Sequence, residues 1–388
     1  TQVNQLISQM RTFLNSLPDS ADLQFVIDLN SNYEKLISEH ESLKGSHPLI
    51  SWVAQSRIHK FTSAVENQEL QKLNLYLFIY QRIESKQSGV TSFFEKPKRF
   101  EKTRRENHEK RIHELSQLCI SITSSLETIG LRVVPVSSAK IRKLIYQVLN
   151  PTRSQSFDTP KVSNEHRDQE FSVDELNAAP ALILSSPREQ LAFSDLIQGV
   201  DSFFLDDYYH RVISLKTLPE YTYSALVSRT LGLPFHYLMS VQIQVPEQSK
   251  ELSALQTKRR MAHSMSASHG GRATDLESEA RLQSTEELLR ELINTGQKIF
   301  YFQLCFLLKA KTRDALDLQT KSVLSRFREM NGAEGLAETV AGFKVFKTLL
   351  PAGNTTTVRT KRIKTDNLAD FLPLYQSWEG DGKPVCLF

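Results

Sequence analysis

The 388-residue sequence contains only three cysteines, Cys119, Cys305 and Cys386, which lie far apart and form no CxxC pair. Small secreted domains depend on several disulfides, and zinc sites need cysteine or histidine ligands at short spacings. The sequence therefore predicts neither a disulfide framework nor a zinc site. It favours a reducing, cytoplasmic compartment.

Long apolar runs are also lacking. The longest, "IFYFQLCFLL" from Ile299 to Leu308, contains Gln303 and is far shorter than the roughly 20 residues that a membrane helix needs. The N-terminal stretch "TQVNQLISQMRTF" lacks the basic and then apolar order of a secretory signal. We therefore expect any membrane contact to be peripheral or to run through a partner.

Charge of one sign is not in large excess, since 48 basic and 44 acidic residues give a net charge of +4. That excess is too small to indicate a nucleic-acid binder by itself. One segment, "KPKRFEKTRRENHEKR", is locally basic, and it could contact the phosphates of nucleic acid or lipid headgroups. The interpretation that we favour is a solvated start to a long helix. In the alternative, in which this segment binds phosphates, the candidate contact residues are Lys98, Arg99, Arg104 and Arg105.

The sequence also lacks recognisable nucleotide-binding, metal-binding and catalytic motifs. The phosphate-binding pattern GxxxxGK[ST] does not occur, and its nearest relative, "GDGKP", has Pro384 where a hydroxyl side chain and a backbone donor are needed. His263 and His269 have no third ligand at metal-binding spacing. Asp206 and Asp207 are adjacent, so on a strand they would point to opposite faces, and a turn or cap role is favoured. We expect no catalytic residue, metal or cofactor in this chain.

What the sequence does contain is alternation between strand and helix patterns. Period-two hydrophobicity predicts strands over 22–30, 72–83, 131–136, 208–219, 235–246 and 297–311. Both faces of the second strand are apolar or aromatic, which predicts a central position. Helical spacing predicts helices over 33–43, 48–65, 101–129, 138–151 and 220–232, a helix capped by Thr312, and two helices separated by the Ser-rich segment 263–274.

These elements predict an α+β protein of two lobes, each with a mixed or largely antiparallel sheet packed with helices. The order of elements suggests a degenerate internal repeat. The first lobe spans 1–150, a polar linker or surface excursion spans 151–190, and the second lobe spans 191–352. Residues 353–388 form a connector.

The C-terminal part of the chain resembles a known family. A turn at Leu350–Gly353 is followed by Thr365, Asn367, Leu368, Ala369, Pro373, Trp378 and Gly380. This arrangement is similar to the stretch ahead of the motor domain in conjugation and type IV secretion ATPases of the TraC/TrbE/CagE type. "YYHRVISLKTLPEYT" resembles the middle region of that family, and "LPDSADLQFVIDLN" resembles its N-terminal strand. Ala352 stands where a glycine is expected.

The resemblance implies a non-catalytic N-terminal region that docks a motor against the inner-membrane part of a bacterial type IV secretion machine and helps its subunits assemble, as a hexamer in the full-length protein. It places the chain in the cytoplasm at the inner face of the inner membrane. It implies that ATP and magnesium bind only in a motor domain beyond Phe388, so that the apolar ending "KPVCLF" would be the first strand of that domain. Aromatic residues anchor many interfaces. The candidates here are Phe203, Phe204, Tyr208, Tyr209 and Trp378, with a place in the core as the alternative for the first four.

Overall fold

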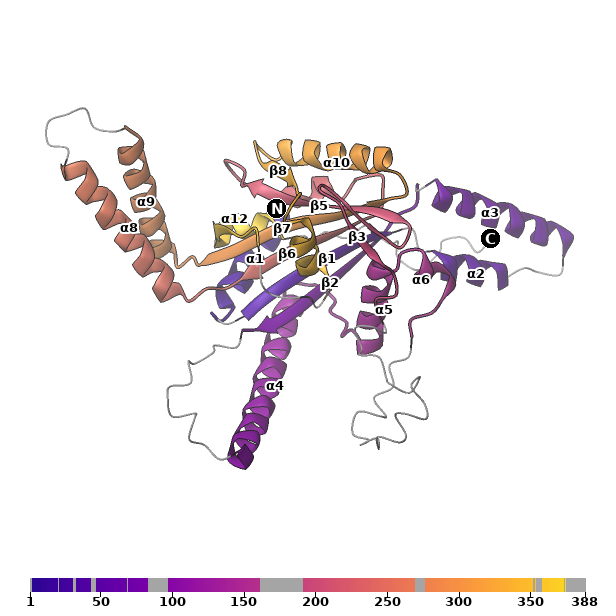
Figure 1. The fold of residues 1–388 in the computed structure, drawn as a ribbon, viewed down its shortest axis with the longest axis horizontal. Helices are drawn as coiled ribbons and strands as arrows, with labels where there is room; N and C mark the ends of the chain where they lie inside the picture. The colour runs from indigo at the N-terminus through magenta and orange to yellow at the C-terminus, as the bar shows by residue number, and fades with distance from the viewer. Residues whose placement is uncertain are drawn as a thin grey trace.

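The computed structural model describes residues 2–19, 21–30, 33–42, 47–67, 69–82, 97–160, 191–268, 276–351, 353, 358–372 and 374. They form a mixed α+β fold around one antiparallel sheet (Figure 1). The strand order is β2-β1-β6-β7-β5-β4-β3, with β8 paired to β5 and β9 paired to β7. The strands are β1 (Ala21–Asn30), β2 (Lys72–Gln81), β3 (Leu196–Gln198), β4 (Phe203–Leu205), β5 (Tyr208–Thr217), β6 (Tyr237–Gln244), β7 (Ile299–Ala310), β8 (Glu334–Ala337) and β9 (Lys361–Lys364).

The α+β class and the antiparallel pairing are confirmed, but the two predicted lobes do not have a sheet each. β1 from the N-terminal part pairs along its length with β6, for example Phe25 with Val241, so one sheet crosses the predicted boundary. β2 is the last strand of the described order and not a central one. Its side chains are mostly half-buried, because the apolar layers on both faces of the sheet end there.

One face of the sheet carries the main core. Alternate residues of β1, β6 and β7 point to this face, as period-two alternation requires. α1 (Gln2–Ser16), α10 (Arg313–Arg328), α12 (Thr365–Asp370) and the short 3-10 helix η3 (Leu226–Thr230) cover it together with the C-terminal half of α4 (Pro97–Thr128). Fully buried phenylalanines dominate this core: Phe25, Phe300, Phe302, Phe306, Phe327 and Phe371.

The opposite face is smaller and partly polar. α11 (Gly342–Leu349) packs on it through Val345, Phe346 and Leu349, and α5 (Ser138–Leu149) through Val148. Buried glutamines join α11 to the sheet. Gln24 on β1 and Gln242 on β6 both donate to the carbonyl of Thr348, and Gln303 on β7 donates to the Thr348 hydroxyl at 3.1 Å.

Three helical projections leave the sheet in different directions (Figure 1). They are α2 (Glu34–Ser42) with α3 (Pro48–Glu66), α4, and α8 (Gln248–Ser268) with α9 (Leu276–Thr295). On α4, Ile122 and Leu126 are buried, whereas Ile112 is 55% exposed on the projecting half. α8 continues to Ser268, beyond the break predicted at His263. None of the described helices has the length and apolar character that crossing a membrane requires.

Two other predicted elements differ from the structure. Residues 131–136 are irregular and largely exposed, and Pro135 cannot donate a ladder hydrogen bond. Between 220 and 232 only η3 forms, because Ala225 has a φ of 66°, which is left-handed and incompatible with an α-helix.

The other predicted helices and strands in the described regions are present. The Thr312 cap of α10 is confirmed by its hydroxyl, which accepts from Ala315 N at 3.3 Å.

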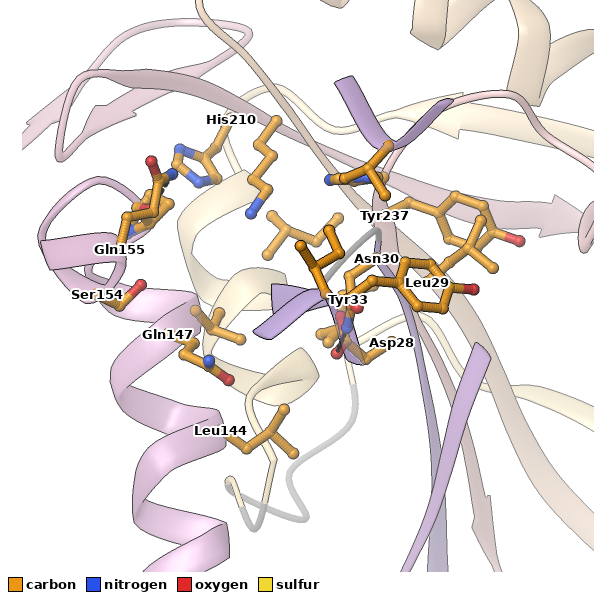
Figure 2. A pocket seen from close by; sticks show the side chains of 18 residues that line it. Asp28, Leu29, Asn30, Tyr33, Leu144, Gln147, Ser154, Gln155, His210 and Tyr237 are labelled. Carbon is orange, nitrogen blue, oxygen red and sulfur yellow. Dashed lines mark hydrogen bonds between the residues drawn. The ribbon is translucent and has the colours of Figure 1, made fainter. Parts of the chain in front are cut away.

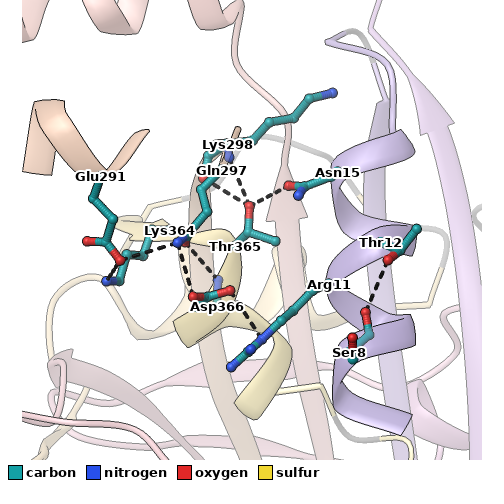
Figure 3. A network of polar contacts seen from close by, with 10 residues as sticks. All are labelled: Ser8, Arg11, Thr12, Asn15, Glu291, Gln297, Lys298, Lys364, Thr365 and Asp366. Carbon is teal, nitrogen blue, oxygen red and sulfur yellow. Dashed lines mark hydrogen bonds and ion pairs between the residues drawn. The ribbon is translucent and has the colours of Figure 1, made fainter. Parts of the chain in front are cut away.

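A polar network fixes the base of the α8–α9 projection against α1 and α12 (Figure 3). Buried Thr365 accepts a hydrogen bond from Lys298 N at 2.9 Å and donates to Asn15 Oδ1 at 2.6 Å. Asp366 is paired with Arg11, Nε to Oδ1 at 3.1 Å, and also accepts from Gln297. The start of β7 is therefore held by side chains from neighbouring helices.

Candidate functional site

A cavity of about 330 Å³ lies at one end of the sheet, and we call it the sheet-end cavity. β1 ends there, β6 and β5 begin there, and β7 ends there. In Figure 2, Leu144, Gln147, Ser154 and Gln155 face it from α5 and α6 (Arg153–Ser156), opposite Asp28 and Asn30 of β1. Its remaining lining is Leu29, Tyr33, Ile37, Val65, Val148, Pro151, His210, His236, Tyr237, Leu238, Leu307 and Lys309.

Lys309 supplies the cation of this cavity. It lies near the end of β7, and the sheet register places it directly opposite His210 of β5. Burial lowers the pKa of the Lys309 ammonium, while the charge of Asp28 raises it by a smaller amount. The Lys309 Nζ also lies 5.7 Å from the centre of the Tyr208 ring, within cation–π range.

Asp28 supplies the anion, and neighbouring amides bind it. Asn30 Nδ2 donates to Asp28 Oδ2 at 2.5 Å. Burial raises the pKa of the Asp28 carboxyl, whereas the hydrogen bonds from Asn30 and Asn74 and the charge of Lys309 oppose the rise. Asp28 and Lys309 act on each other through space and form no direct ion pair in the described chain.

The two histidines of the cavity are neutral at pH 7. Burial, reinforced by the charge of Lys309, lowers the pKa of His210 to about 3 and that of His236 to about 4. The His210 ring stacks on Phe203 with a centroid distance of 5.2 Å. Its Nδ1 lies 3.1 Å from the Tyr208 carbonyl oxygen, so Nδ1 carries the proton and donates, and Nε2 remains an acceptor.

The groups around the cavity are suited to binding a polar ligand. Within the described ranges, no three His, Cys, Asp or Glu side chains are grouped so that they could hold a metal ion. Cys305 is the nearest thiol in sequence to Lys309, but burial raises its pKa to about 12 and its Sγ is engaged with Ser214. A half-buried cation, neutral imidazoles and apolar side chains together can hold a polar group of a ligand.

The predicted aromatic candidates gather on the β4–β5 hairpin but differ in exposure. Phe203 is buried and packs on Phe346 at 4.8 Å, so the core alternative is correct for it. Phe204 and Tyr209 are half-buried and meet edge to face at 5.0 Å. Tyr208 is half-buried beside Lys309 and Lys311. Three of the four therefore keep part of their surface available.

Asp206 and Asp207 form the turn of this hairpin with φ values of 49° and 65°, which confirms the predicted turn role. Asp206 Oδ2 also accepts from the backbone N–H groups of Thr152 and Arg153 at 2.6 and 2.9 Å. It therefore fixes the α6 end of the cavity wall.

The other residues predicted to contact phosphates or partner proteins stay predictions. The backbone of Lys98, Arg99, Arg104 and Arg105 is helical within α4, but their side chains lie outside the described residues, as do Trp378, His269 and the C-terminal "KPVCLF". His263 is exposed on α8. Most of the predicted linker, 161–190, also lies outside the described residues.

Sequence reasoning missed the sheet-end cavity. The sequence did contain one indication of it, a lysine on the buried face of a strand. Lys309 follows the apolar run of β7 and lies on the same face as Leu307 and Cys305. Locating the cavity also required the strand order, which joins β1 to β6 and β7 across more than 200 residues of sequence, as in the pair Asp28 and Leu238.

A second feature is an apolar surface on the first two turns of α3, which we call the α3 surface. α3 packs on α2, where Phe61 stacks on His40, and none of its residues is buried. Four large apolar side chains near its start are exposed: Leu49 by 68%, Ile50 by 56%, Trp52 by 67% and Val53 by 47%. Contiguous exposed apolar residues of this kind mark interaction sites.

Comparison with protein families gives a match over most of the chain. A family model described as TraC protein matches residues 1–332. No curated protein matches the chain. The matched range includes every strand of the sheet except β8 and β9, and it includes the α3 surface and the whole lining of the sheet-end cavity.

Proposed function

Because this chain belongs to the TraC family of type IV conjugative transfer proteins, we propose that it docks to the inner-membrane part of the transfer machine and helps subunits of the machine to assemble. In this proposal the chain is non-catalytic. Nucleotide chemistry, with ATP and magnesium, belongs to a motor domain outside this sequence. A peripheral position at the inner membrane and a hexameric assembly are part of the same proposal.

The observation that carries the proposal is the α3 surface. Trp52 and its apolar neighbours are exposed at the start of α3, on a projection that leaves the sheet (Figure 1). Exposed tryptophan is a common interface anchor, since it buries a large apolar area on docking. Among possible occupants we favour a protein component of the inner-membrane machinery, because the family works in a multi-protein transfer system.

Cell fractionation tests this function. The chain would be expressed in bacteria with and without the genes for the inner-membrane components of a cognate type IV transfer system. We expect it in the membrane fraction only when those components are present. Equal recovery in the soluble fraction under both conditions would contradict docking, and membrane recovery under both would indicate lipid binding instead.

A further inference from the structure

The sheet-end cavity contains a cation whose hydrogen-bonding capacity is unused by the described residues. The Lys309 ammonium has three donors and no acceptor of its own. Its neighbours in the described chain are the Tyr208 ring, the His210 and His236 imidazoles and, through space, the Asp28 carboxylate. No described acceptor is hydrogen-bonded to it. The Lys309 side chain is half-buried and lines the cavity, so a ligand that brings an acceptor can pair with its ammonium without displacing a protein partner.

Asp28 makes no hydrogen bond to Lys309 in the described chain, and its carboxylate instead accepts from amide donors. Asn30 and Asn74 donate to its carboxylate, with Asn30 Nδ2 at 2.5 Å from Oδ2. The His210 Nδ1–H is likewise engaged by the Tyr208 carbonyl oxygen. Among the described residues that line the cavity, Lys309 is therefore the one cationic donor, and it lies in a lining that also has uncharged polar side chains such as Gln147 and Ser154.

The rest of the lining limits the chemical class of the ligand. Leu144, Val148 and Leu307 contribute an apolar part of the cavity wall. Phosphate groups carry up to two negative charges and are usually held by several basic side chains or backbone N–H groups, whereas the described lining brings one lysine. A carboxylate on an aliphatic chain matches both parts, because its oxygens accept from the ammonium while its chain displaces water from the wall.

We propose that the sheet-end cavity binds a carboxylate group carried on a short apolar chain, and that Lys309 is the residue that pairs with it. The carboxylate is either that of a free small acid or that of an acidic side chain in a peptide. This binding site does not depend on the docking function proposed above.

The test is an NMR titration of the whole chain, labelled with ¹³C at lysine side chains, with hexanoate and with hexanamide as the uncharged control. We expect saturable shifts of the Lys309 Cε resonance with hexanoate and at least tenfold weaker binding of hexanamide. Equal binding of the two probes, no binding of hexanoate, or tighter binding of inorganic phosphate would overturn the proposal.

Variants assign the site. Lys309→Met should weaken hexanoate binding at least tenfold, whereas Lys311→Met, which removes a nearby lysine also placed over the Tyr208 ring, should leave it unchanged within about twofold. Equal losses in both variants would contradict the assignment to Lys309. If Lys309→Met does not fold, Lys309→Gln replaces it, with the same expected loss.

A peptide arm separates the two sources of the carboxylate. The probe is a blocked pentapeptide with one glutamate flanked by leucines, compared with its glutamine counterpart. Tighter binding of the glutamate peptide than of hexanoate assigns the cavity to a peptide side chain, and tighter binding of hexanoate assigns it to a free acid. Equal binding of the glutamate and glutamine peptides, together with equal binding of hexanoate and hexanamide, overturns the carboxylate class.

Discussion

Arg359 and Glu338 form a two-point ion pair in which Arg359 Nε donates to Glu338 Oε1 and Nη2 donates to Oε2, each at 2.8 Å. The Glu338 side chain is 1% exposed and the Arg359 side chain is 39% exposed. The pair joins the end of β8 to the residues just before β9.

Removing one partner of this pair should cost more than removing both. Arg359→Leu leaves a buried carboxylate unpaired, and we expect the free energy of unfolding to fall by about 2 to 3 kcal/mol. The double variant with Glu338→Leu should recover at least half of that loss, because no buried charge is left. Urea denaturation measures both. A double variant less stable than Arg359→Leu alone would contradict this account.

Gln303 should be needed for the attachment of α11 and of the segment before β9. Its Oε1 accepts from Val358 N at 2.9 Å and Arg359 N at 2.8 Å, and its Nε2 donates to Gln242 and Thr348. Gln303→Met keeps the size but leaves the N–H groups of half-buried Val358 and Arg359 without their acceptor, so we expect a loss of about 1 to 3 kcal/mol. The control is Gln198→Met at an exposed position of β3, where thermal denaturation should show little change.

Thr365 should stabilise the base of the α8–α9 projection. Thr365→Val removes a buried hydroxyl that both accepts from Lys298 N and donates to Asn15, and we expect a loss of about 1 to 3 kcal/mol in the free energy of unfolding, measured by urea denaturation. Thr12→Val is the matched control, because the Thr12 hydroxyl bonds only within its own helix at an exposed position. Equal losses from the two variants would contradict a role for the buried network.

His210 should make the protein acid-sensitive. Its pKa is about 3 in the folded protein, against 6.5 for an unperturbed histidine, so below pH 6.5 the unfolded chain binds a proton that the folded chain does not. Stability is therefore lost as pH falls, by up to about 1.4 kcal/mol per pH unit from this residue. We expect His210→Phe to lose about 2 kcal/mol less than the wild type between pH 6.5 and 4.5, measured by urea denaturation. Parallel curves would show that His210 does not titrate in this way.

Local patterns in the sequence predicted individual elements better than their arrangement. Alternation located β1, β6 and β7, and Thr312 marked the start of α10, because these signals depend only on neighbouring residues. The single sheet could not be predicted, because the β1–β6 pairing depends on contacts such as Phe25 with Val241 that local patterns do not record. The central position expected for β2 was wrong for a related reason: an edge strand can be apolar on both faces when helices cover it in part.

For the candidate sites, too, the sequence predicted the features that depend on neighbouring residues and missed those that depend on the arrangement of elements in space. The turn role of Asp206 followed from local chemistry, whereas the sheet-end cavity depends on four strand ends meeting in space. The exposure of the α3 surface was not evident either. Its apolar residues fit a buried helix face equally well in the sequence, and only the packing shows that α2 leaves them uncovered.

The α3 surface should matter for docking and not for folding. Trp52→Ser changes a side chain that is 67% exposed, so we expect the free energy of unfolding to change by less than about 0.5 kcal/mol. Recovery in the membrane fraction should nevertheless fall in cells that contain the transfer machinery. Ile293→Ser on α9 is the control, since Ile293 is 65% exposed on another helical projection. Equal effects of the two variants on membrane recovery would contradict a specific role for α3.

Site-specific photo-crosslinking tests the docking proposal most directly. A photoreactive phenylalanine analogue would replace Trp52 in one variant and Ile293 in another, in cells that carry the transfer machinery, and crosslinked partners would be identified by mass spectrometry. The account predicts an adduct with an inner-membrane component of the machinery from position 52 and none from position 293. No protein adduct at position 52, or the same adduct from both positions, would contradict it.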